Sequence, residues 1–386
     1  PTPLAIALER RHSARNYDPL PVVLVRGEGA HVWDEAGRRY LDCMSAYSAV
    51  SLGHAHPRIL RALTQQAGRL AVTSRAYYND RLPAFLARLC RLTGIKAARK
   101  WAYEVKRVPH DRAEIIAAEG NFHGRSIAIT GLSSEPQYRQ GFGPFPPGLK
   151  LVPYGDLAAL ERALTPHTAA FLVEPIQGER GIVVPPPGYL EACARLCRSR
   201  GVLLIADEVQ TGLGRTGRLL ACDHEHLRPD GLILGKALGG GLLPVSAFLA
   251  RADVMDVFRP GDHGSTFGGN PLAAAVGLET LNVLVEERLP ERAAELGARL
   301  VRGLRAIASP LVLDVRGKGL LVGVEIDPAR ATARRVVDGL LARGVLSKDT
   351  HGTVVRFAPP LVIEPEDIDA AVAALRATLA EIERAG

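Results

Sequence analysis

Short apolar runs alternate with amphipathic segments through the middle of the chain. Apolar residues fill positions 169–173, 202–206 and 231–234, and between the first two runs the apolar positions of residues 189–200 recur at helical spacing. Buried strands that alternate with helices are typical of a mostly parallel sheet covered on both faces. We therefore predict a large α/β domain in this part of the chain.

The two ends of the chain show a different pattern. Residues 22–42 contain three short runs separated by glycine turns, which predicts strands, and a helical pattern begins at Pro57. A long amphipathic helix follows Pro271, then apolar runs at 312–316 and 320–326, and a final helix over 366–383. These patterns predict a smaller α+β domain built from both chain ends. We place its two parts at residues 1–50 and 283–386, and the large domain at 51–282.

Length and composition limit the class of protein. With 386 residues, 47% of them hydrophobic, the chain can form two cores. No apolar stretch reaches the roughly 20 residues that cross a bilayer, and residues 1–15 lack the apolar core of a signal peptide. The 48 basic residues are dispersed among 41 acidic ones, which is typical of a solvated surface and not of nucleic-acid binding. We expect a cytoplasmic protein that acts on small molecules.

The cysteines and histidines predict no metal site. Cys193 and Cys197 lie one helical turn apart, but no nearby histidine or second cysteine pair completes a zinc set. His54 and His56 alternate before Pro57, a pattern typical of a polar turn. We interpret the five cysteines as buried small residues or free thiols.

Two ionisable residues end apolar runs and supply the candidate chemistry. Lys236 follows residues 231–235 beside a glycine loop, where partial desolvation lowers the pKa of its amine and favours Schiff-base formation. Asp207 ends residues 202–206, so its carboxylate is expected at the carboxyl edge of the sheet, where it can keep a pyridine nitrogen protonated. The two residues predict a pyridoxal 5'-phosphate site. The alternative is a surface lysine and a helix-capping aspartate.

Longer motifs around these residues resemble those of a known family. LIADEVQTG at 204–212 and LGKALGG at 234–240 resemble the two signature motifs of class III aminotransferases, which are pyridoxal phosphate enzymes of fold type I. Five more stretches resemble the ornithine δ-aminotransferases of that class: NYDPLPV (16–22), SAYSAV (45–50), NFHGR (121–125), EPIQGE (174–179) and GSTFGGN (264–270). The resemblance runs from about residue 16 to the C-terminus. It implies the fold type I architecture, with a large and a smaller domain.

The resemblance also implies roles in cofactor binding. Lys236 would bind the cofactor covalently and move a proton as general base and acid, and Asp207 would support the ring nitrogen. The other implied contacts are Phe122 on one ring face, His123 beside it, Val209 and Gln210 at the other face and the phenolic oxygen, and Ser265 and Thr266 at the phosphate of the neighbouring subunit in a homodimer. The alternative is a core aromatic for Phe122 and an ordinary turn for Ser265 and Thr266.

Five residues account for the predicted choice of substrate: Tyr17, Tyr47, Arg125, Glu179 and Arg356. Two arginines suit a dicarboxylate such as 2-oxoglutarate, because each guanidinium can bind one carboxylate through two hydrogen bonds. Ornithine has one carboxylate, which Arg125 would bind, with Tyr17 at the α-amine. Glu179 would neutralise Arg356 while ornithine is bound and release it for the dicarboxylate. The alternative for this pair is a surface salt bridge.

The implied reaction moves the δ-amino group of L-ornithine to 2-oxoglutarate and gives glutamate 5-semialdehyde and glutamate. The nearest rival is an acetylornithine or other ω-amine aminotransferase with the same core, and Tyr17 and Tyr47 favour free ornithine over an acylated amine. Two further alternatives are an aminomutase and a non-catalytic binding protein on this fold. The presence of both Lys236 and Asp207 disfavours the last of these.

One junction lacks the expected phosphate-binding turn. Residues 95–106 predict a helix, yet Gly94 offers no capping side chain and the first turn is cationic, against the helix dipole. In the family that the chain resembles, a strand and a turn whose N–H groups bind the cofactor phosphate stand here. Roughly fifteen positions of that family are absent between Gly94 and Ile95. Because loss of a core strand would prevent folding, we expect further residues of a disordered loop at this point.

Overall fold

The computed structural model describes residues 4–12, 19–74, 76–88 and 94–385. Its helices are α1 (Leu4–His12), α2 (Ser45–Ser48), α3 (Pro57–Ala67), α4 (Leu82–Arg88), α5 (Gly94–Glu104), α6 (Ile127–Thr130), α7 (Pro136–Arg139), α8 (Leu157–Ala163), α9 (Tyr189–Ser199), α10 (Ala252–Met255), α11 (Pro271–Glu286), α12 (Leu289–Arg305), α13 (Ala333–Ala342) and α14 (Pro365–Ala385), with short 3-10 helices η1 (Ala221–Glu225) and η2 (Lys236–Gly239). Its strands are β1 (Leu24–Glu28), β2 (His31–Asp34), β3 (Arg39–Asp42), β4 (Glu114–Ala118), β5 (Leu149–Val152), β6 (Thr168–Val173), β7 (Leu203–Asp207), β8 (Gly231–Leu234), β9 (Ala247–Ala250), β10 (Val312–Lys318), β11 (Leu321–Ile326), β12 (Val345–Leu346), β13 (Lys348–Thr350) and β14 (Val354–Phe357).

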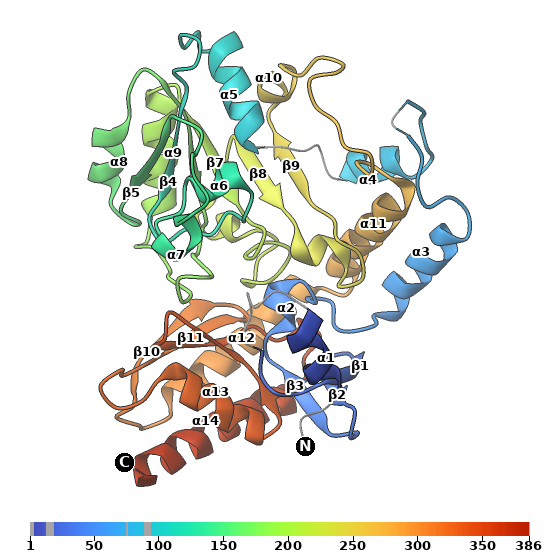
Figure 1. Ribbon diagram of the computed structural model, residues 1–386, viewed down its shortest axis with the longest axis vertical. Helices are drawn as coiled ribbons and strands as arrows, with labels where there is room; N and C mark the ends of the chain where they lie inside the picture. Colours follow the sequence, from blue (N-terminus) through green and yellow to red (C-terminus); the bar gives the residue numbers. More distant parts are fainter. Residues whose placement is uncertain (1–3, 13–18, 75, 89–93, 386) are drawn as a thin grey trace.

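A six-stranded sheet forms the upper body in Figure 1, with the order β5-β4-β6-β7-β8-β9. All neighbouring pairs are parallel except β8 and β9. Alternate residues of its strands face opposite sides: Ile115 packs in the core beneath α5, and Ile116 packs in the core beneath α9. Helices therefore cover both faces, and the predicted mostly parallel α/β domain is confirmed.

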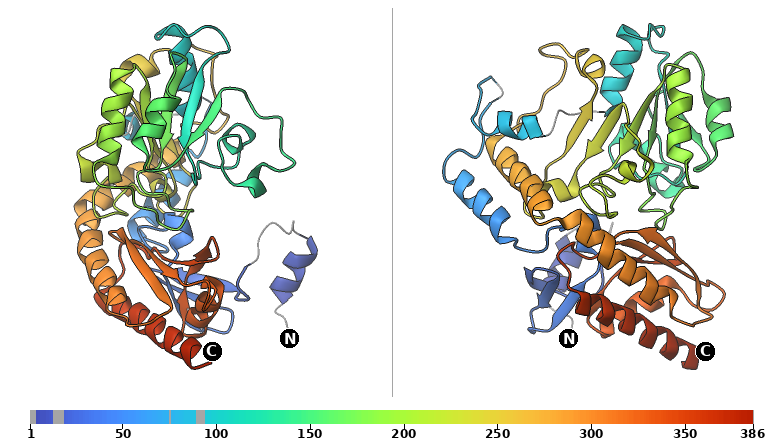
Figure 2. Two further views of the ribbon diagram at one scale, coloured as in Figure 1. Left: turned by 90° about the vertical axis from the view of Figure 1, so that its left-hand side faces the viewer. Right: turned by 180° about the vertical axis from the view of Figure 1, so that it is seen from behind.

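Both ends of the chain meet in the lower body, which holds two four-stranded sheets (Figures 1 and 2). One sheet has the order β10-β11-β14-β13 and is antiparallel throughout. The other has the order β1-β2-β3-β12, in which β12 from the C-terminal part pairs in parallel with β3 from the N-terminal part. This arrangement confirms a smaller α+β domain from both chain ends. The boundaries 1–50, 51–282 and 283–386 stay a prediction.

The expectation of further residues between Gly94 and Ile95 stays a prediction. Gly94 and Ile95 are consecutive residues of α5, which packs Ala97, Ala98 and Trp101 against the large sheet. The apolar face of this helix determines its position, because it buries these side chains. Residues 89–93, which precede the helix, lie outside the described part.

The histidines and cysteines that were considered as metal ligands have other surroundings. His54 Nε2 lies 2.8 Å from Asp42 Oδ2, and His56 precedes α3 and faces Glu287 at 3.5 Å. Cys43, Cys193, Cys197 and Cys222 are buried free thiols, whereas Cys90 lies outside the described residues. Among the residues that the structure describes, no helix is both long and apolar enough to cross a bilayer.

Candidate active site

The two candidate catalytic residues lie at the ends of adjacent strands. Asp207 is the last residue of β7 and pairs with Ile233 of β8, and Lys236 follows β8 by two residues. Because β7 and β8 are parallel, both side chains lie at the carboxyl edge of the sheet, as predicted. Asp207 caps no helix, and Lys236 is mostly buried, so the alternative of a surface lysine and a capping aspartate is wrong.

Lys236 is held in a strained backbone conformation with its amine largely out of water. Its φ of 45° lies in the left-handed region, which non-glycine residues rarely adopt and which is often found at functional sites. Burial lowers the pKa of its amine, as does the nearby Arg356 charge, while Glu179 and Asp207 oppose the shift. Nζ lies 5.9 Å from the centroid of the Tyr47 ring, and among the described residues it has no hydrogen-bond or ion-pair partner.

A histidine fixes the carboxylate of Asp207. His123 Nδ1 lies 2.7 Å from Asp207 Oδ2, and the backbone N–H of Val209 donates to Asp207 Oδ1 at 3.1 Å. Burial alone would lower the pKa of His123, but the bond to Asp207 and its charge raise it above the ordinary value. His123 Nε2 is buried and has no hydrogen-bond partner in the described part of the chain. The sequence predicted His123 beside the cofactor but not its bond to Asp207.

Glu174 is a buried carboxyl that the sequence reasoning did not assign. Burial raises its pKa to about 7, and its Oε2 accepts a hydrogen bond from the backbone N–H of Phe122 at 2.9 Å. The charges of His123 and Asp207 act on it as well. Its place in the EPIQGE motif beside Glu179 was the available signal, because a carboxylate at the end of the buried strand β6 requires a partner.

Arg125 lies on aromatic rings and not beside the other arginine. Its Cζ is 4.2 Å from the centroid of Tyr138 and 5.3 Å from that of Phe122, and the two rings meet edge to face at 6.0 Å. The Arg125 side chain is exposed, so its guanidinium can still bind an anion. Tyr138 was missed by the sequence reasoning. The predicted stacking of Phe122 on a cofactor and the binding of a carboxylate by Arg125 stay predictions.

Arg356 and Glu179 form a buried ion pair. Arg356 Nη1 donates to Glu179 Oε1 at 2.9 Å, and Gln210 joins them, since its Nε2 donates to Glu179 at 3.1 Å and its Oε1 accepts from Arg356 at 3.2 Å. The Arg356 side chain is only 1% exposed, so the alternative of a surface salt bridge is wrong. Burial would raise the pKa of Glu179, but Arg356 and Gln210 lower it. Arg356 Nε is buried without a hydrogen-bond partner among the residues that the structure describes.

Tyr47 reaches this pair from a left-handed turn. Four consecutive residues, Ser45 to Ser48, have φ between 42° and 72°, although none is glycine. Each such residue costs roughly 1–2 kcal/mol, so the surrounding bonds must hold the turn. Asp42 Oδ1 accepts from Met44 and Ser45 N–H, and Ser45 Oγ donates to the Ala358 carbonyl. The turn places the Tyr47 ring centroid 5.4 Å from Arg356 Cζ.

Most of the predicted site residues lie close together. Asp207 and His123 are bonded to each other, and the charges of Asp207, Glu179 and Arg356 all act on the Lys236 amine. Val209 packs on Gly235 next to Lys236. Ser265 and Thr266 are exposed in a loop before α11 and form no hydrogen bond or ion pair with another site residue among those that the structure describes. Tyr17 lies outside the described residues.

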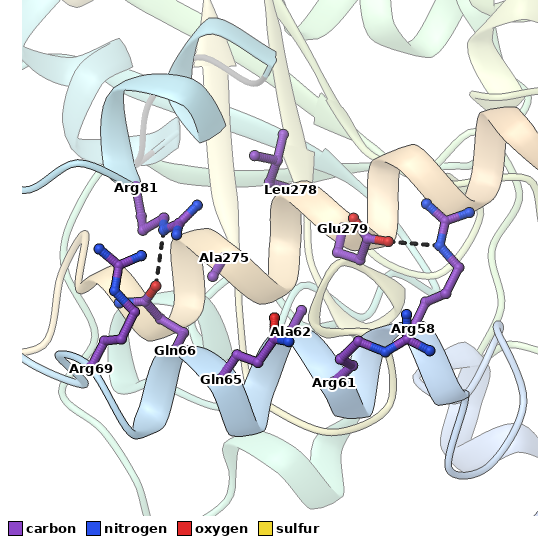
Figure 3. Close-up of a pocket in the computed structure, with 10 residues that line it drawn as sticks. All are labelled: Arg58, Arg61, Ala62, Gln65, Gln66, Arg69, Arg81, Ala275, Leu278 and Glu279. Carbon is purple, nitrogen blue, oxygen red and sulfur yellow. Dashed lines mark hydrogen bonds and ion pairs between the residues drawn. The ribbon is translucent and has the colours of Figure 1, made fainter.

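A separate groove of about 670 Å³ lies between α3 and α11 (Figure 3). None of its lining residues is a predicted site residue. Three of its four arginines have partners: Arg58 contacts Glu279 at 2.7 Å, and Arg81 donates to Gln66 at 2.9 Å (Figure 3), while Arg69 faces Asp80 at 3.5 Å. Glu279 is the one acidic residue of the lining, so the groove stays basic.

Relatives with known names match nearly the whole chain. The chain is 50% identical to an ornithine aminotransferase of Geobacillus sp. (strain WCH70), over 98% of both proteins. The crystal structure of the ornithine aminotransferase from Toxoplasma gondii ME49 superimposes with a TM-score of 0.95 at 46% identity, covering 99% of this chain and 96% of that one. The acetylornithine aminotransferase from Elizabethkingia anophelis gives a TM-score of 0.89 at 47% identity, covering 98% of each chain.

The comparisons also indicate that this chain lacks residues that the family has. The alignment with the Geobacillus protein runs over 394 positions but contains only 98% of these 386 residues, about 378, so about 16 positions have no residue here. The family model described as "Aminotransferase class-III" matches in two segments, residues 12–95 and 90–379, which meet at the start of α5. This is where the phosphate-binding turn was expected. Together the two segments cover almost all of the chain, which therefore belongs to the class III aminotransferases.

Proposed function

We propose that this protein transfers the δ-amino group of L-ornithine to 2-oxoglutarate and gives glutamate 5-semialdehyde and glutamate. The observation that carries the proposal is the buried ion pair between Arg356 and Glu179, 2.9 Å apart, beside the amine of Lys236. An arginine that is paired in one state and free in another suits an enzyme whose two substrates differ by one carboxylate at the reacting end. The ornithine aminotransferases among the relatives support the same substrate.

The residues at the ring end of the site fit pyridoxal 5'-phosphate. Lys236 offers a desolvated amine without a partner, and Asp207 offers a carboxylate fixed by two hydrogen bonds. When bound, this cofactor supplies an electron sink that weakens the bonds of the amino-bearing carbon. Val209 packs on Gly235 and Phe122 lies beside His123, so both can contact the faces of a ring. Gln210 would contact the phenolic oxygen.

Lys236 moves the proton in the proposed reaction. Its amine, with a lowered pKa, would remove the proton from the δ-carbon of ornithine as general base and deliver it as general acid to the methine carbon of the cofactor in the same half-reaction. In the second half it would move a proton in the opposite direction, to the carbon that becomes the α-carbon of glutamate. Asp207 would hold the pyridine nitrogen of the cofactor, and His123 holds the Asp207 side chain in place. Burial of the site excludes water from the reacting carbon.

The phosphate end of the site is less complete within one chain. The family model is interrupted near the start of α5, where the turn that binds the phosphate was expected, since its two matches cover residues 12–95 and 90–379. We propose that Ser265 and Thr266 reach this group from a second subunit, so that the protein works as a homodimer with shared sites. Their exposure in the single chain is compatible with such an interface.

Substrate recognition follows from the charges. While ornithine is bound, Glu179 neutralises Arg356, so that no unpaired cation repels the δ-amine. When 2-oxoglutarate or glutamate binds, Arg356 turns from Glu179 to the carboxylate next to the reacting carbon. Arg125 binds the far carboxylate, and Tyr17 and Tyr47 contact the remaining polar groups.

An acetylornithine aminotransferase is the second candidate, since one such enzyme matches this chain at 47% identity with a TM-score of 0.89. We favour free ornithine because Tyr47, whose ring centroid lies 5.4 Å from Arg356 Cζ and 5.9 Å from Lys236 Nζ, brings a hydroxyl-bearing ring into this site. An acylated amine cannot donate in the same way as a free ammonium group.

The proposal is tested by a substrate panel. Purified protein is loaded with pyridoxal 5'-phosphate and assayed with 2-oxoglutarate and either ornithine, acetylornithine or 4-aminobutyrate, with glutamate and the aldehyde product both quantified. The proposal predicts the highest kcat/KM for ornithine and formation of glutamate 5-semialdehyde. A higher kcat/KM for acetylornithine would mean that acetylornithine, and not ornithine, is the preferred substrate. Glutamate formation without an aldehyde at the δ-carbon would contradict the proposed reaction.

A further inference from the structure

The residue that gates Arg356 lies in a short hairpin of the large body. Gln177 and Val183 exchange two backbone hydrogen bonds of 3.0 Å and close a loop after β6 that contains Glu179. Gly181 has a φ of 104°, and Ile182 has a φ of 57° and is fully buried, so the loop follows one defined path. Gln177 Nε2 donates to the Glu119 carbonyl at 2.8 Å, which fixes the base of the hairpin to the large sheet.

The tip of this hairpin is bonded to the other body through its backbone. Thr350 Oγ1 of β13 donates to the Glu179 carbonyl, and Arg316 of β10 donates to the Gly181 carbonyl from Nε at 3.1 Å and from Nη2 at 2.8 Å. Arg316 is itself held by Glu325 of β11 at 2.7 Å. Each of these donors comes from a strand of the β10-β11-β14-β13 sheet, which also carries Arg356.

Apolar contacts reinforce the same attachment. Ile182 of the hairpin packs in one cluster with Ile176, Leu321 and Ala358. A side chain at Gly323 of β11 would come within 3.1 Å of the Gly181 carbonyl, and one at Gly181 would come within 2.8 Å of Val354. The tip of the hairpin therefore lies against the β10-β11-β14-β13 sheet through its backbone and its apolar contacts. These contacts do not involve the Glu179 carboxylate, which forms the ion pair with Arg356.

We propose that Thr350 and Arg316 are positioning residues for substrate choice. They hold the backbone of Glu179 against the β10-β11-β14-β13 sheet in both states of the site. In one state the Glu179 carboxylate pairs with Arg356, and in the other a dicarboxylate substrate binds Arg356. The switch then moves only the side chains of Glu179 and Arg356, and the two can pair again as soon as the dicarboxylate leaves. This inference rests on the proposed two-substrate function.

The test compares both substrates in Thr350→Val, which keeps the shape of the side chain and removes the donor. With a looser hairpin Glu179 pairs less often with Arg356, so kcat/KM for ornithine falls relative to kcat/KM for glutamate. We expect the ornithine-to-glutamate ratio to fall by about 2- to 10-fold, the loss that one hydrogen bond between neutral groups gives. Arg316→Met is expected to change the ratio in the same direction.

Two control variants separate positioning from a general loss of structure. Thr350→Ser keeps the hydroxyl and should restore the wild-type ratio. Thr353→Val changes a threonine of the same β13–β14 turn, whose hydroxyl has no partner among the described residues, and should leave the ratio unchanged. A ratio in Thr350→Val equal to that of the wild type, or a ratio not restored by serine, would overturn the proposal.

Hydrogen exchange distinguishes this failure from a failure of the proposed function. The amides of Gln177 and Val183 should exchange faster in Thr350→Val than in the wild type, whichever amino donor the enzyme uses. If the wild type does not use ornithine but these amides respond, the proposed function is wrong and the attachment of the hairpin is confirmed. Unchanged exchange in Thr350→Val overturns the attachment itself.

Discussion

The charged side chains of the site are buried within reach of one another, so the charge of each depends on its neighbours. Lys236 is pushed towards its neutral form by burial and by Arg356, whereas Glu179 is kept ionised by Arg356 against the cost of burial. Removing one member of such a cluster changes the protonation of the others. Substitutions at this scale therefore test electrostatic roles more than packing.

Lys236→Ala is predicted to abolish transamination. The variant loses both the amine that binds the cofactor and the group that moves the proton, which together should lower kcat by at least about a thousand-fold. The measurement is single-turnover conversion with ornithine, together with borohydride reduction of the loaded protein. A reducible protein–cofactor adduct that persists in Lys236→Ala would show that another amine carries the cofactor.

Glu174 is predicted to make stability depend on pH. Burial raises its pKa from the ordinary 4.5 to about 7, so between these values the folded state binds a proton that the unfolded state has released. The stability that this group contributes is present below pH 4.5 and is lost as the pH rises through 7, by up to about 3 kcal/mol. In Glu174→Gln, which stays neutral, this loss should be absent.

The check is the difference in Tm between wild type and Glu174→Gln from pH 5 to pH 8. We expect the wild type to lose stability relative to the variant as the pH rises. Glu295→Gln, at an exposed position of α12, serves as the control and should follow the wild type. A constant difference between wild type and Glu174→Gln over this range would mean that Glu174 does not titrate there.

The sequence predicted which residues stand at the strand ends but not how they pair. Asp207 and Lys236 were recognisable because each ends an apolar run. The bond between His123 and Asp207 joins positions 84 residues apart, and the bond between Arg356 and Gln210 joins positions 146 apart. Contacts at such separations depend on the packing of whole elements, so a pattern along the chain cannot specify them. The roles in cofactor and substrate binding stay predictions.

At the scale of elements, regular segments were easier to predict than irregular ones. The strands at 169–173 and 203–207 and the helix at 189–199 match the predicted ranges within one or two residues, because their apolar spacing is set by burial. In α3, however, Leu60 is 43% exposed, whereas Gln66 is only 3% exposed and bonds with Arg81. The left-handed turn around Tyr47 gives no signal in the sequence, because no glycine marks it.

Arg215 joins several of these elements and is predicted to be essential for stability. It is fully buried after β7, and it donates to the Leu320 and Pro359 carbonyls and to Ser51 Oγ, so it connects both chain ends to the large body. Arg215→Met leaves these acceptors unpaired and should lower the free energy of unfolding by roughly 3 kcal/mol or more. Denaturant unfolding measures the loss.

Arg218→Met provides the matched control, because Arg218 lies three residues further in the same loop and is exposed. It should change the free energy of unfolding by less than about 0.5 kcal/mol. Equal stability of Arg215→Met and Arg218→Met would mean that water or a rearranged side chain satisfies the freed acceptors, and that Arg215 does not hold the two bodies together.

At the scale of the molecule, the candidate site draws on both bodies in Figure 1. Asp207 and Lys236 come from the large sheet, whereas Arg356 comes from β14 of the lower body and Tyr47 from α2. Substrate binding therefore depends on how the bodies meet. Composition and pattern predicted the two bodies, but the exposed loop with Ser265 and Thr266 requires a second copy to acquire its proposed role.

A shared site in a homodimer predicts that two inactive variants complement each other. Lys236→Ala is mixed with a Ser265→Ala/Thr266→Ala double variant after both are unfolded and refolded together. In a mixed dimer one site carries both defects and the other carries neither, so the mixture should recover about a quarter of wild-type activity. No recovery, or a fully active monomer in sedimentation, would exclude shared sites.

The central claim is that one pocket serves both a diamine acid and a dicarboxylate because Glu179 gates Arg356. The most direct test is kcat/KM for ornithine and for glutamate in Glu179→Ala. Loss of this charge-assisted contact should lower ornithine use by roughly ten- to a hundred-fold, while glutamate use is kept or improved, because Arg356 is permanently free. Equal falls for the two substrates would show that Glu179 is only structural and would contradict the switch.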